Sequence, residues 1–273
     1  MNFAAKILAD SLHPNGSRLT TFELTYPRFV HSELMTHRKF SRNSASSRAI
    51  PTKVLLRQVK DTPVIPIHWG ALQKGMQAFK ELKGHPQSEC RRRWMDARDF
   101  ALFCAEQMLE LGLHKQIVNR LLEPWMWITV IVTSDERGLA NWFKLRCHPD
   151  AEPHINLLAN LMRDVYDNNT VVRRELAIGD WHLPFINDAE LDFYGTEDCV
   201  HKSVARCARG SYLQHNGYFE FADDVKLGKK LSEVGHWSAF EHQAKCTDGG
   251  APSNFVSGWL QNRKLYLGED GCK

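Results

Sequence analysis

Residues 36–48 read THRKFSRNSASSR, and this stretch carries more chemical information than any other part of the chain. It sets His37, Arg38, Arg42 and Arg48 among serines and an asparagine. Guanidinium and hydroxyl groups suit a phosphate, while amide and hydroxyl groups suit the edge of a heterocycle. A solvated loop with capping serines has a similar composition. The stretch therefore indicates an anion site, while its composition alone leaves the structural interpretation open.

The sequence around this stretch alternates strand and helix signals, without an internal repeat. Residues 19–36 (LTTFELTYPRFVHSELMT) predict a strand that passes into the start of a helix. Residues 125–133 (WMWITVIVT) favour a buried strand, although a buried helix fits the same pattern. Helices are predicted over residues 86–113, 115–122, 151–167 and 223–234.

Composition narrows the class of protein. The chain has 273 residues and a mass of 31.4 kDa, which suits one large domain or two small ones. Its content of 43% hydrophobic and 25% charged residues excludes disorder or a coiled coil as a description of the whole chain. The net charge of +3 requires neither a nucleic-acid polymer nor an anionic membrane as partner. It still permits a local basic pocket for a small phosphate ligand.

The location of the protein is predicted by similar arguments. The longest uncharged apolar run, residues 124–134, is shorter than the about 20 residues that a membrane helix needs. The N-terminal residues lack the pattern of a secretory signal. The seven cysteines are odd in number and no two are spaced as CxxC, so neither a disulfide framework nor a zinc ribbon is predicted. These features favour a reducing cytoplasm.

A second polar cluster follows the apolar run. Residues 135–146 read DERGLANWFKLR, and within them Arg137 and Asn141 are four positions apart. On a helix these two side chains share a face. An ordinary amphipathic helix with an exposed polar face explains the same spacing, so the cluster indicates a site only in combination with other segments.

A third cluster lies near the C-terminus, where residues 235–243 read GHWSAFEHQ. His236, Glu241 and His242 are types of residue that bind metals. However, their order, H-x4-E-H, supplies no third ligand at a helical step. We therefore predict no metal site, and a core or ligand-lining role for these side chains.

Read together, these segments resemble the flavin-dependent thymidylate synthases. The first stretch resembles the family signature RHRxxSxNxxSxR, and it matches at His37, Arg38, Ser41, Asn43, Ser46 and Arg48. ANWFKLR (140–146) resembles the family helix in which an Asn precedes Leu-Arg, and KQIVNRLLEP (115–124) resembles the segment in which an Arg precedes Leu-Pro. GHWSAFEH (235–242) is similar to the family's GHxSxFEH, and SVARCARGSY (203–212) resembles its ARxS opening.

The order of these segments is unusual. In the family, the ARxS and GHxSxFEH segments precede the RHR signature, whereas here they follow it at residues 203–242. The resemblance therefore implies an α+β fold, a mixed sheet with long helices in circularly permuted order. Residues 1–273 would form a single domain, in which 179–199 connects the permuted halves, a rearrangement that closely spaced termini make tolerable. The alternative is an added C-terminal domain with a fortuitous match.

The resemblance also implies roles for individual residues. The residues that it implies for FAD binding are His37, Arg38, Asp135, Arg137, Asn141, His236 and Ser238. The residues that it implies for nucleotide binding are Glu33, Thr36, Ser44, Ser46, Ser47, Arg48, Arg120 and Arg146. Arg146 is the implied catalytic residue, because a guanidinium against the pyrimidine favours the N3-deprotonated form of the base.

The activity that the resemblance implies is C5-methylation of a pyrimidine deoxynucleotide, most simply dUMP to dTMP. FAD would be the cofactor, NADPH and methylenetetrahydrofolate the cosubstrates, and the site would be shared between subunits of a homotetramer. The flavin carries the difficult step in this family, so no cysteine is needed as a nucleophile.

Four positions depart from the family pattern. Thr36 replaces the first Arg of the RHR motif, Ser44 replaces a Glu, Glu33 replaces a Gln and Asp135 replaces an Asn. Since cytosine presents a donor where uracil presents an acceptor, acid-for-amide exchanges bear on the choice of base. Two alternatives therefore stay open. One is another C5-modified product, either hydroxymethyl-dUMP or a dCMP product, and the other is a non-catalytic nucleotide- or flavin-binding homologue.

Overall fold

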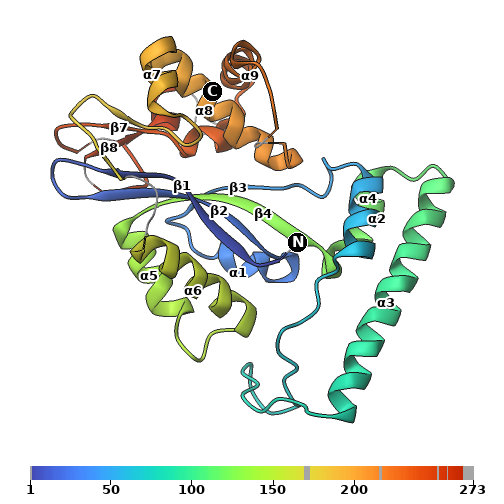
Figure 1. Ribbon diagram of the computed structural model, residues 1–273. Helices are drawn as coiled ribbons and strands as arrows, with labels where there is room; N and C mark the ends of the chain where they lie inside the picture. The colour runs from blue at the N-terminus through green and yellow to red at the C-terminus, as the bar shows by residue number, and fades with distance from the viewer. Residues whose placement is uncertain (1, 169–172, 215–216, 251, 257, 267–273) are drawn as a thin grey trace.

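The fold is built on one mixed sheet, as the resemblance implied (Figure 1). The structure is a computed structural model that describes residues 2–168, 173–214, 217–250, 252–256 and 258–266. The strands of the main sheet lie in the order β3-β4-β2-β1-β5. Their bounds are β1 Ala4–Leu12, β2 Arg18–Pro27, β3 Ser41–Ser44, β4 Trp127–Asp135 and β5 Arg174–Glu175. β5 runs parallel to β1, and the other pairs are antiparallel.

The pair β2–β4 forms the centre of this sheet. It runs from Leu19 opposite Asp135 to Pro27 opposite Trp127. Every residue of β4 after Trp127 is buried, and its β-branched and aromatic sequence suits burial on both faces. The strand prediction within 19–36 is therefore confirmed, and the open choice for 125–133 is decided in favour of a strand.

Helices cover both faces of the main sheet, with α5 and α6 on one side and α7, α8 and α9 on the other (Figure 1). The helix bounds are α1 His31–Met35, α2 Thr52–Asp61, α3 His85–Glu110, α4 Lys115–Val118, α5 Glu136–Arg146, α6 Pro153–Asp167, α7 Asp188–Tyr194, α8 Thr196–Arg209 and α9 Phe221–Glu233. The 3-10 turns are η1 Arg28–Val30, η2 Asn119–Trp125, η3 Gly210–Tyr212, η4 Trp237–Glu241 and η5 Asn262–Leu265. The helix predictions are confirmed, although 115–122 forms α4 followed by the 3-10 turn η2.

A smaller antiparallel sheet, in the order β6-β7-β8, packs beside the main one. Its strands are β6 Trp181–His182, β7 Ala244–Cys246 and β8 Trp259–Gln261. A buried chain of hydrogen bonds links the two sheets: it runs from Ser11 Oγ through the His182 ring, Thr21 and Thr133 to His242 Nδ1, in steps of 2.7–2.9 Å. Burial lowers the pKa of His182 and of His242 to about 3, so both imidazoles stay neutral.

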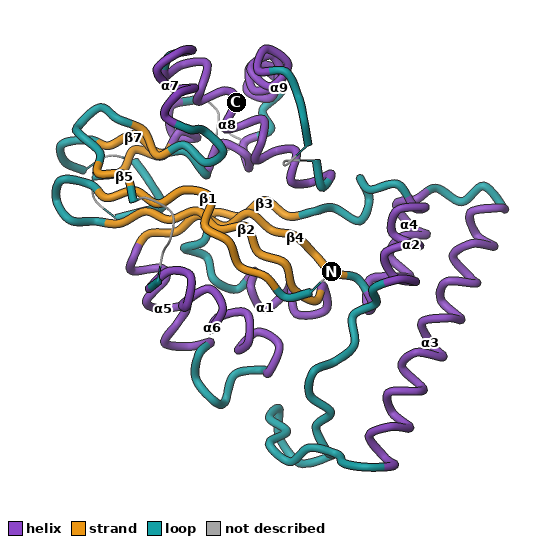
Figure 2. The backbone as a smooth tube through the Cα atoms, viewed as in Figure 1, coloured by secondary structure: helices purple, strands orange, loops and turns teal. Residues whose placement is uncertain are grey.

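The helix α3 stands away from the main sheet (Figure 2). Of its 26 residues, only Ala101, Leu102 and Ala105 are buried. Phe100 and Phe103 are 68% and 57% exposed, although aromatic side chains contribute most when they are buried. The helix ends before Gly112, whose φ of +83° suits a residue without a Cβ. A single chain thus leaves much of this apolar surface in contact with solvent.

Residues 179–199, the predicted connector, form β6, α7 and the first turn of α8. A capping box between Asn187 and Glu190 begins α7, and Leu183 and Cys199 are buried in a cluster with Val200. The segment is thus an ordered part of the fold. The circularly permuted order itself, and the single-domain description that includes it, remain predictions.

Candidate functional site

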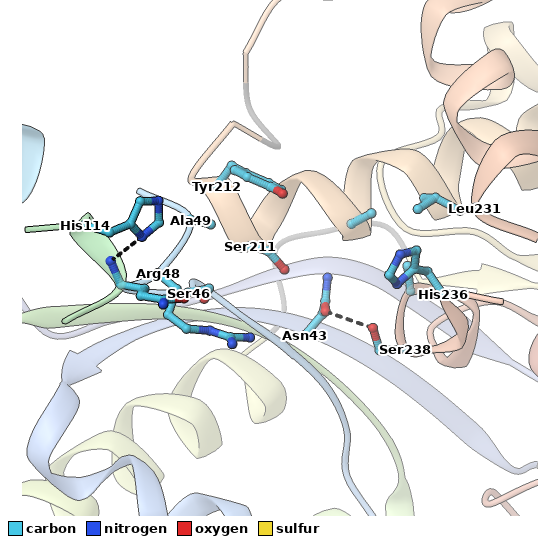
Figure 3. A pocket seen from close by; sticks show the side chains of 13 residues that line it. Asn43, Ser46, Arg48, Ala49, His114, Ser211, Tyr212, Leu231, His236 and Ser238 are labelled. Carbon is cyan, nitrogen blue, oxygen red and sulfur yellow. Dashed lines mark hydrogen bonds between the residues drawn. The ribbon is translucent and has the colours of Figure 1, made fainter. Parts of the chain in front are cut away.

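Side chains from distant parts of the sequence surround one cavity of about 470 Å³, which we call the Arg48 cavity (Figure 3). They come from the loop after β3, from the start of α4, and from η3, η4 and the helices beside them. The lining residues are Asn43, Ser46, Arg48, Ala49, His114, Gln116, Ala208, Ser211, Tyr212, Leu231, His236, Ser238 and Ala239. Among the predicted site residues, Ser46, Arg48, His236 and Ser238 meet here.

Backbone hydrogen bonds hold the loop that carries Arg48. The pairing of β3 with β4 continues when the Ala45 N–H donates to the Thr129 carbonyl at 2.8 Å. The next N–H, that of Ser46, donates to the Ser211 carbonyl in η3 at 2.9 Å. The loop is therefore fixed between β4 and η3, and this places the first predicted segment against the ARxS-like segment.

Asn43 forms the floor of the cavity. Its Nδ2 donates to the carbonyl of Cys207, and its Oδ1 accepts from Ser238 Oγ at 3.4 Å (Figure 3). The amide therefore has a defined orientation and it orients the Ser238 hydroxyl. Burial raises the pKa of the Cys207 thiol, so this cysteine stays protonated and is no nucleophile.

The Arg48 cavity has a positive and donor-rich character. No described residue that lines it is acidic, whereas Arg48, His114 and His236 contribute one guanidinium and two imidazoles, all on exposed side chains. Hydroxyl groups of serines and a tyrosine supply further donors. Such a lining fits a small anion with a polar ring better than it fits an apolar ligand.

A second group of predicted residues surrounds Arg146, and we call Glu33, Thr36, His37 and Arg146 the Arg146 cluster. Arg146 is the last residue of α5. Its Nε donates to His37 Nε2 at 3.0 Å, its Nη1 lies 3.4 Å from Glu33 Oε2, and its Nη2 lies 3.4 Å from Thr36 Oγ1. These contacts fix the direction of the guanidinium in the folded chain.

Burial and charge set the protonation of this cluster. Burial, together with the nearby guanidiniums of Arg146 and Arg42, lowers the pKa of His37 to about 4. The imidazole is therefore neutral at pH 7, as an acceptor from Arg146 must be. Burial and the nearby carboxylate of Glu152 raise the pKa of Glu33, although Arg146 opposes this shift.

The Arg146 cluster opens onto two grooves. One has a volume of about 260 Å³ and is lined by His37, Arg38, Asn141 and Arg146 among others. The other has a volume of about 680 Å³ and lies between Glu33, Arg146 and the loop that contains residues 76–79. No described residue lines both the Arg48 cavity and either groove, so one chain keeps the two groups of predicted residues apart.

The fit of these residues to FAD is partial in one chain. Arg38 and Asn141 are exposed on the smaller groove and present a cation and an amide, which suit a pyrophosphate. His236 and Ser238, also predicted for FAD, line the separate Arg48 cavity. The donor set therefore fits the cofactor chemically, whereas the smaller groove alone is too small to enclose a flavin dinucleotide.

Some predicted residues are already engaged in the fold. Asp135 caps α5, since its Oδ1 accepts from the Gly138 N–H at 2.7 Å, and its Oδ2 accepts from the Val256 N–H at 2.8 Å. Ser47 is buried, and its hydroxyl donates to Glu123 at 2.7 Å.

Three other predicted residues line none of these cavities. Ser44 Oγ lies 3.5 Å from His31 Nε2. Arg137, at the start of α5, and Arg120, in η2, are exposed and line none of the cavities described above.

Several lining residues were not predicted. Ser211 lies in the ARGSY segment, so the resemblance contained a signal for it. His114 and Gln116 precede and begin the short helix α4, and nothing in their sequence context distinguishes them from ordinary capping residues. Tyr212 and Leu231 are also ordinary in sequence, and only the packing of η3 and α9 brings them to the cavity.

The third sequence cluster does not converge on a metal. In the described part of the chain, no group of three His, Cys, Asp or Glu side chains is placed to hold one. His236 points into the Arg48 cavity, Glu241 pairs with Arg263, and His242 is fully buried. No helix among the described residues is both long enough and apolar enough to span a membrane.

Comparisons with known proteins identify a matching family and similar solved structures. The family model described as "Thymidylate synthase complementing protein" matches residues 18–168. This span contains the stretch 36–48, Arg120 and Arg146, and it ends before the segments at 203–242. No curated protein matches the chain.

Two solved structures of a UMP/dUMP methylase, PolB from Streptomyces cacaoi, are similar to this chain. The one bound with 5-Br UMP has 18% identity and a TM-score of 0.50, and the match covers 61% of this chain and 89% of that chain. The one bound with 5-Br dUMP has 19% identity and a TM-score of 0.46, with 55% and 67% covered. At 18% identity, the likeness to the structure bound with 5-Br UMP shows the fold alone.

Proposed function

The chain belongs to the thymidylate synthase complementing protein family, and from this premise we propose that it methylates C5 of a pyrimidine deoxynucleotide, most simply dUMP to dTMP. The observation that carries the proposal is the Arg48 cavity. Its described lining offers a guanidinium, imidazoles, hydroxyls and an amide, and no carboxylate. A nucleoside monophosphate needs this combination, because its phosphate is anionic and its base is recognised by hydrogen bonds at its edge.

The residues of the cavity bind and orient the nucleotide in this proposal. Arg48 and Ser46, which the resemblance implies for nucleotide binding, hold the phosphate in this proposal, and the Asn43–Ser238 pair lines the other part of the cavity. Ser47 contributes indirectly: its hydroxyl donates to Glu123 and so fixes the loop that carries Arg48. The substrate would thus meet groups whose positions the fold has already set.

Arg146 stabilises negative charge on the pyrimidine ring. Its guanidinium stays protonated at any accessible pH, so it favours the N3-deprotonated base. Neutral His37 holds the Nε side, and the Nη1 and Nη2 groups reach Glu33 and Thr36 through longer contacts of 3.4 Å. These weaker contacts are the ones that a substrate can replace.

We propose FAD as the cofactor, with NADPH and methylenetetrahydrofolate as cosubstrates. Arg38, Asn141 and exposed Arg137 would hold the dinucleotide, with His236 and Ser238 on its other side. Bound flavin supplies hydride chemistry, which removes the need for a protein nucleophile. In agreement, no described cysteine lines the Arg48 cavity or the two grooves.

A second copy of the chain would complete this site. In one chain the Arg48 cavity and the Arg146 cluster share no lining residue, although the proposed chemistry needs both. The exposed apolar surface of α3 is the kind of surface that subunit contacts bury. We therefore propose a homotetramer with shared sites. The described cysteines are all free thiols, which agrees with a cytoplasmic protein.

One observation favours a second candidate substrate. The Glu33 carboxylate, where the family has a Gln, lies 3.4 Å from Arg146 Nη1. A carboxylate accepts a hydrogen bond from the exocyclic amino group of cytosine, and it repels the O4 acceptor of uracil. This contact therefore supports a dCMP-type substrate as the alternative.

A product assay tests the proposal. Purified protein is incubated with FAD, NADPH, methylenetetrahydrofolate and either dUMP or dCMP, and the nucleotide is analysed by mass spectrometry. We expect dUMP to gain one methyl group. Turnover of dCMP alone would select the alternative substrate, and a hydroxymethyl gain would change the product. Protein that takes up no flavin, as judged by its absorbance, and converts neither nucleotide would refute the enzymatic function.

A further inference from the structure

We infer that His114 and Gln116 form the phosphate-binding end of the Arg48 cavity together with Arg48, and that Arg120, which the resemblance implies for nucleotide binding, does not. The inference rests on the proposed function, because it names the groups that recognise the phosphate monoester of the same substrate. Both residues line the cavity, while Arg120 is exposed in η2 and lines none of the cavities described above.

The relative position of His114 and Arg48 is built into the fold. Lys115 Nζ donates to the Ala49 carbonyl at 2.8 Å. Buried Asn119 donates through Nδ2 to the carbonyls of Ser47 and Ile50, at 2.6 and 3.0 Å. These bonds hold both ends of α4 against the loop at 46–50, on both sides of Arg48. A ligand between Arg48 and His114 therefore meets a site that is already assembled.

A local hydrogen bond decides which ring nitrogen of His114 faces a ligand as a donor. The Gln116 backbone N–H donates to His114 Nδ1 at 3.3 Å. Nδ1 is therefore an acceptor, and in the neutral imidazole the proton sits on Nε2. The ring thus offers an N–H group to an anion without needing a positive charge.

The cavity has two chemically different ends. In Figure 3, His114 lies with Arg48 and Ala49 on one side, while His236 and Leu231 lie on the other, with Asn43 and Ser211 between them. The side with Arg48 has the guanidinium and the imidazole N–H, and Gln116, whose backbone N–H donates to the His114 ring, also lines the cavity. The opposite side includes the aliphatic Leu231 and suits the base. A phosphate monoester is thus oriented by the cavity itself.

A carboxylate of the neighbouring turn η2 already has partners within the fold. Glu123, in η2, accepts from Ser47 and pairs with Arg28 at 3.1 Å. Among the described residues, none forms an ion pair with Arg48. The positive charge of Arg48 is therefore directed to a ligand and is not used by the fold.

Equilibrium binding of dUMP and of deoxyuridine to the holoenzyme separates a phosphate contact from a structural effect. We expect His114→Ala to weaken dUMP binding about tenfold, because a hydrogen bond to a charged group is lost, and to leave deoxyuridine binding unchanged. His114→Asn keeps both a capping oxygen and an N–H donor, so it should restore most of the loss. Exposed His85, at the start of α3, is the matched control as His85→Ala.

Two results would overturn the subsite. Equal losses for dUMP and deoxyuridine in His114→Ala would mean that the residue acts on the fold. A loss in Arg120→Ala without one in His114→Ala would return the role to Arg120. The proposed substrate is tested separately. Wild-type protein that binds dCMP but not dUMP would refute dUMP as the substrate. In that case, a tenfold loss of dCMP affinity in His114→Ala would still support the phosphate subsite.

Discussion

The Arg48 cavity and the Arg146 cluster both present a guanidinium, but the fold treats the two differently. Arg48 is exposed in a cavity whose described lining contains no acid. Arg146 is surrounded by His37, Glu33 and Thr36 of its own chain. A guanidinium without a partner in its own chain can give its full interaction energy to a ligand. A guanidinium that already contacts neighbouring side chains has a fixed direction, but it contributes less to ligand affinity because the ligand must replace those contacts. The difference agrees with the proposed roles, in which Arg48 binds the substrate and Arg146 acts on its reactive ring.

Arg146→Ala should produce the largest effect, since in the proposed function this residue faces the charge that develops on the base. We expect the catalytic rate to fall about 100- to 1000-fold, with nucleotide affinity within a few-fold of wild type. Steady-state kinetics and dUMP binding together measure both quantities. Arg91→Ala, an exposed position on α3, is the control. An unchanged rate would remove Arg146 from the chemistry and with it the proposed contrast.

Arg48→Ala should lower the affinity for the nucleotide and leave the catalytic rate nearly unchanged, the opposite of the result expected for Arg146→Ala. Loss of a bidentate contact to phosphate is expected to weaken dUMP binding about 10- to 100-fold, while the rate at saturating dUMP stays near that of wild type. Isothermal titration with dUMP gives the affinity. If the variant lost rate and kept affinity, the two regions would have exchanged their proposed roles.

Acid should destabilise the fold through its neutral histidines. The pKa of His37 is about 4 in the folded chain against an ordinary value of 6.5, so the unfolded chain binds more protons between these values. The stabilising contribution of the neutral ring is complete above pH 6.5 and is lost as pH falls towards 4. At pH 5 the loss is roughly 2 kcal/mol for this group.

The His37→Gln variant makes this expectation specific. Urea unfolding at several pH values gives the protons taken up on unfolding, and near pH 5 the variant should take up about one fewer than wild type. His31, with a pKa lowered to about 4, and His182 and His242, with pKa values of about 3, contribute acid sensitivity in both proteins. An identical pH dependence of the two proteins would mean that His37 is not neutral in the folded chain.

Glu33→Gln should have the smallest effect, on the choice of base. The amide can donate to uracil O4, which the carboxylate cannot. We expect the ratio of kcat/KM for dUMP over dCMP to rise about tenfold in the variant. Competition of the two nucleotides in one reaction measures this ratio directly. A ratio that does not move would place Glu33 away from the base.

Local features of the fold could be predicted from the sequence. The helix at 86–113 follows from apolar spacing within one segment, and the strand within 19–36 from its β-branched and aromatic residues, whereas the apolar run at 125–133 fitted a strand or a buried helix. Such patterns need no information about distant residues. The pairing of β2 with β4 joins residues about 110 positions apart, and no local pattern contains that register.

The same division holds for the candidate site. The sequence by itself determined which chemical groups the chain offers, since THRKFSRNSASSR and its companion segments predicted a site for a nucleotide and a flavin. Only the tertiary structure decided which of those groups are free. It buried Asp135 as a helix cap and bound Ser47 to Glu123, but it left Arg48 open beside His114. The reason is physical: a polar group removed from water must find a partner, and the partner comes from whichever segment the fold brings near.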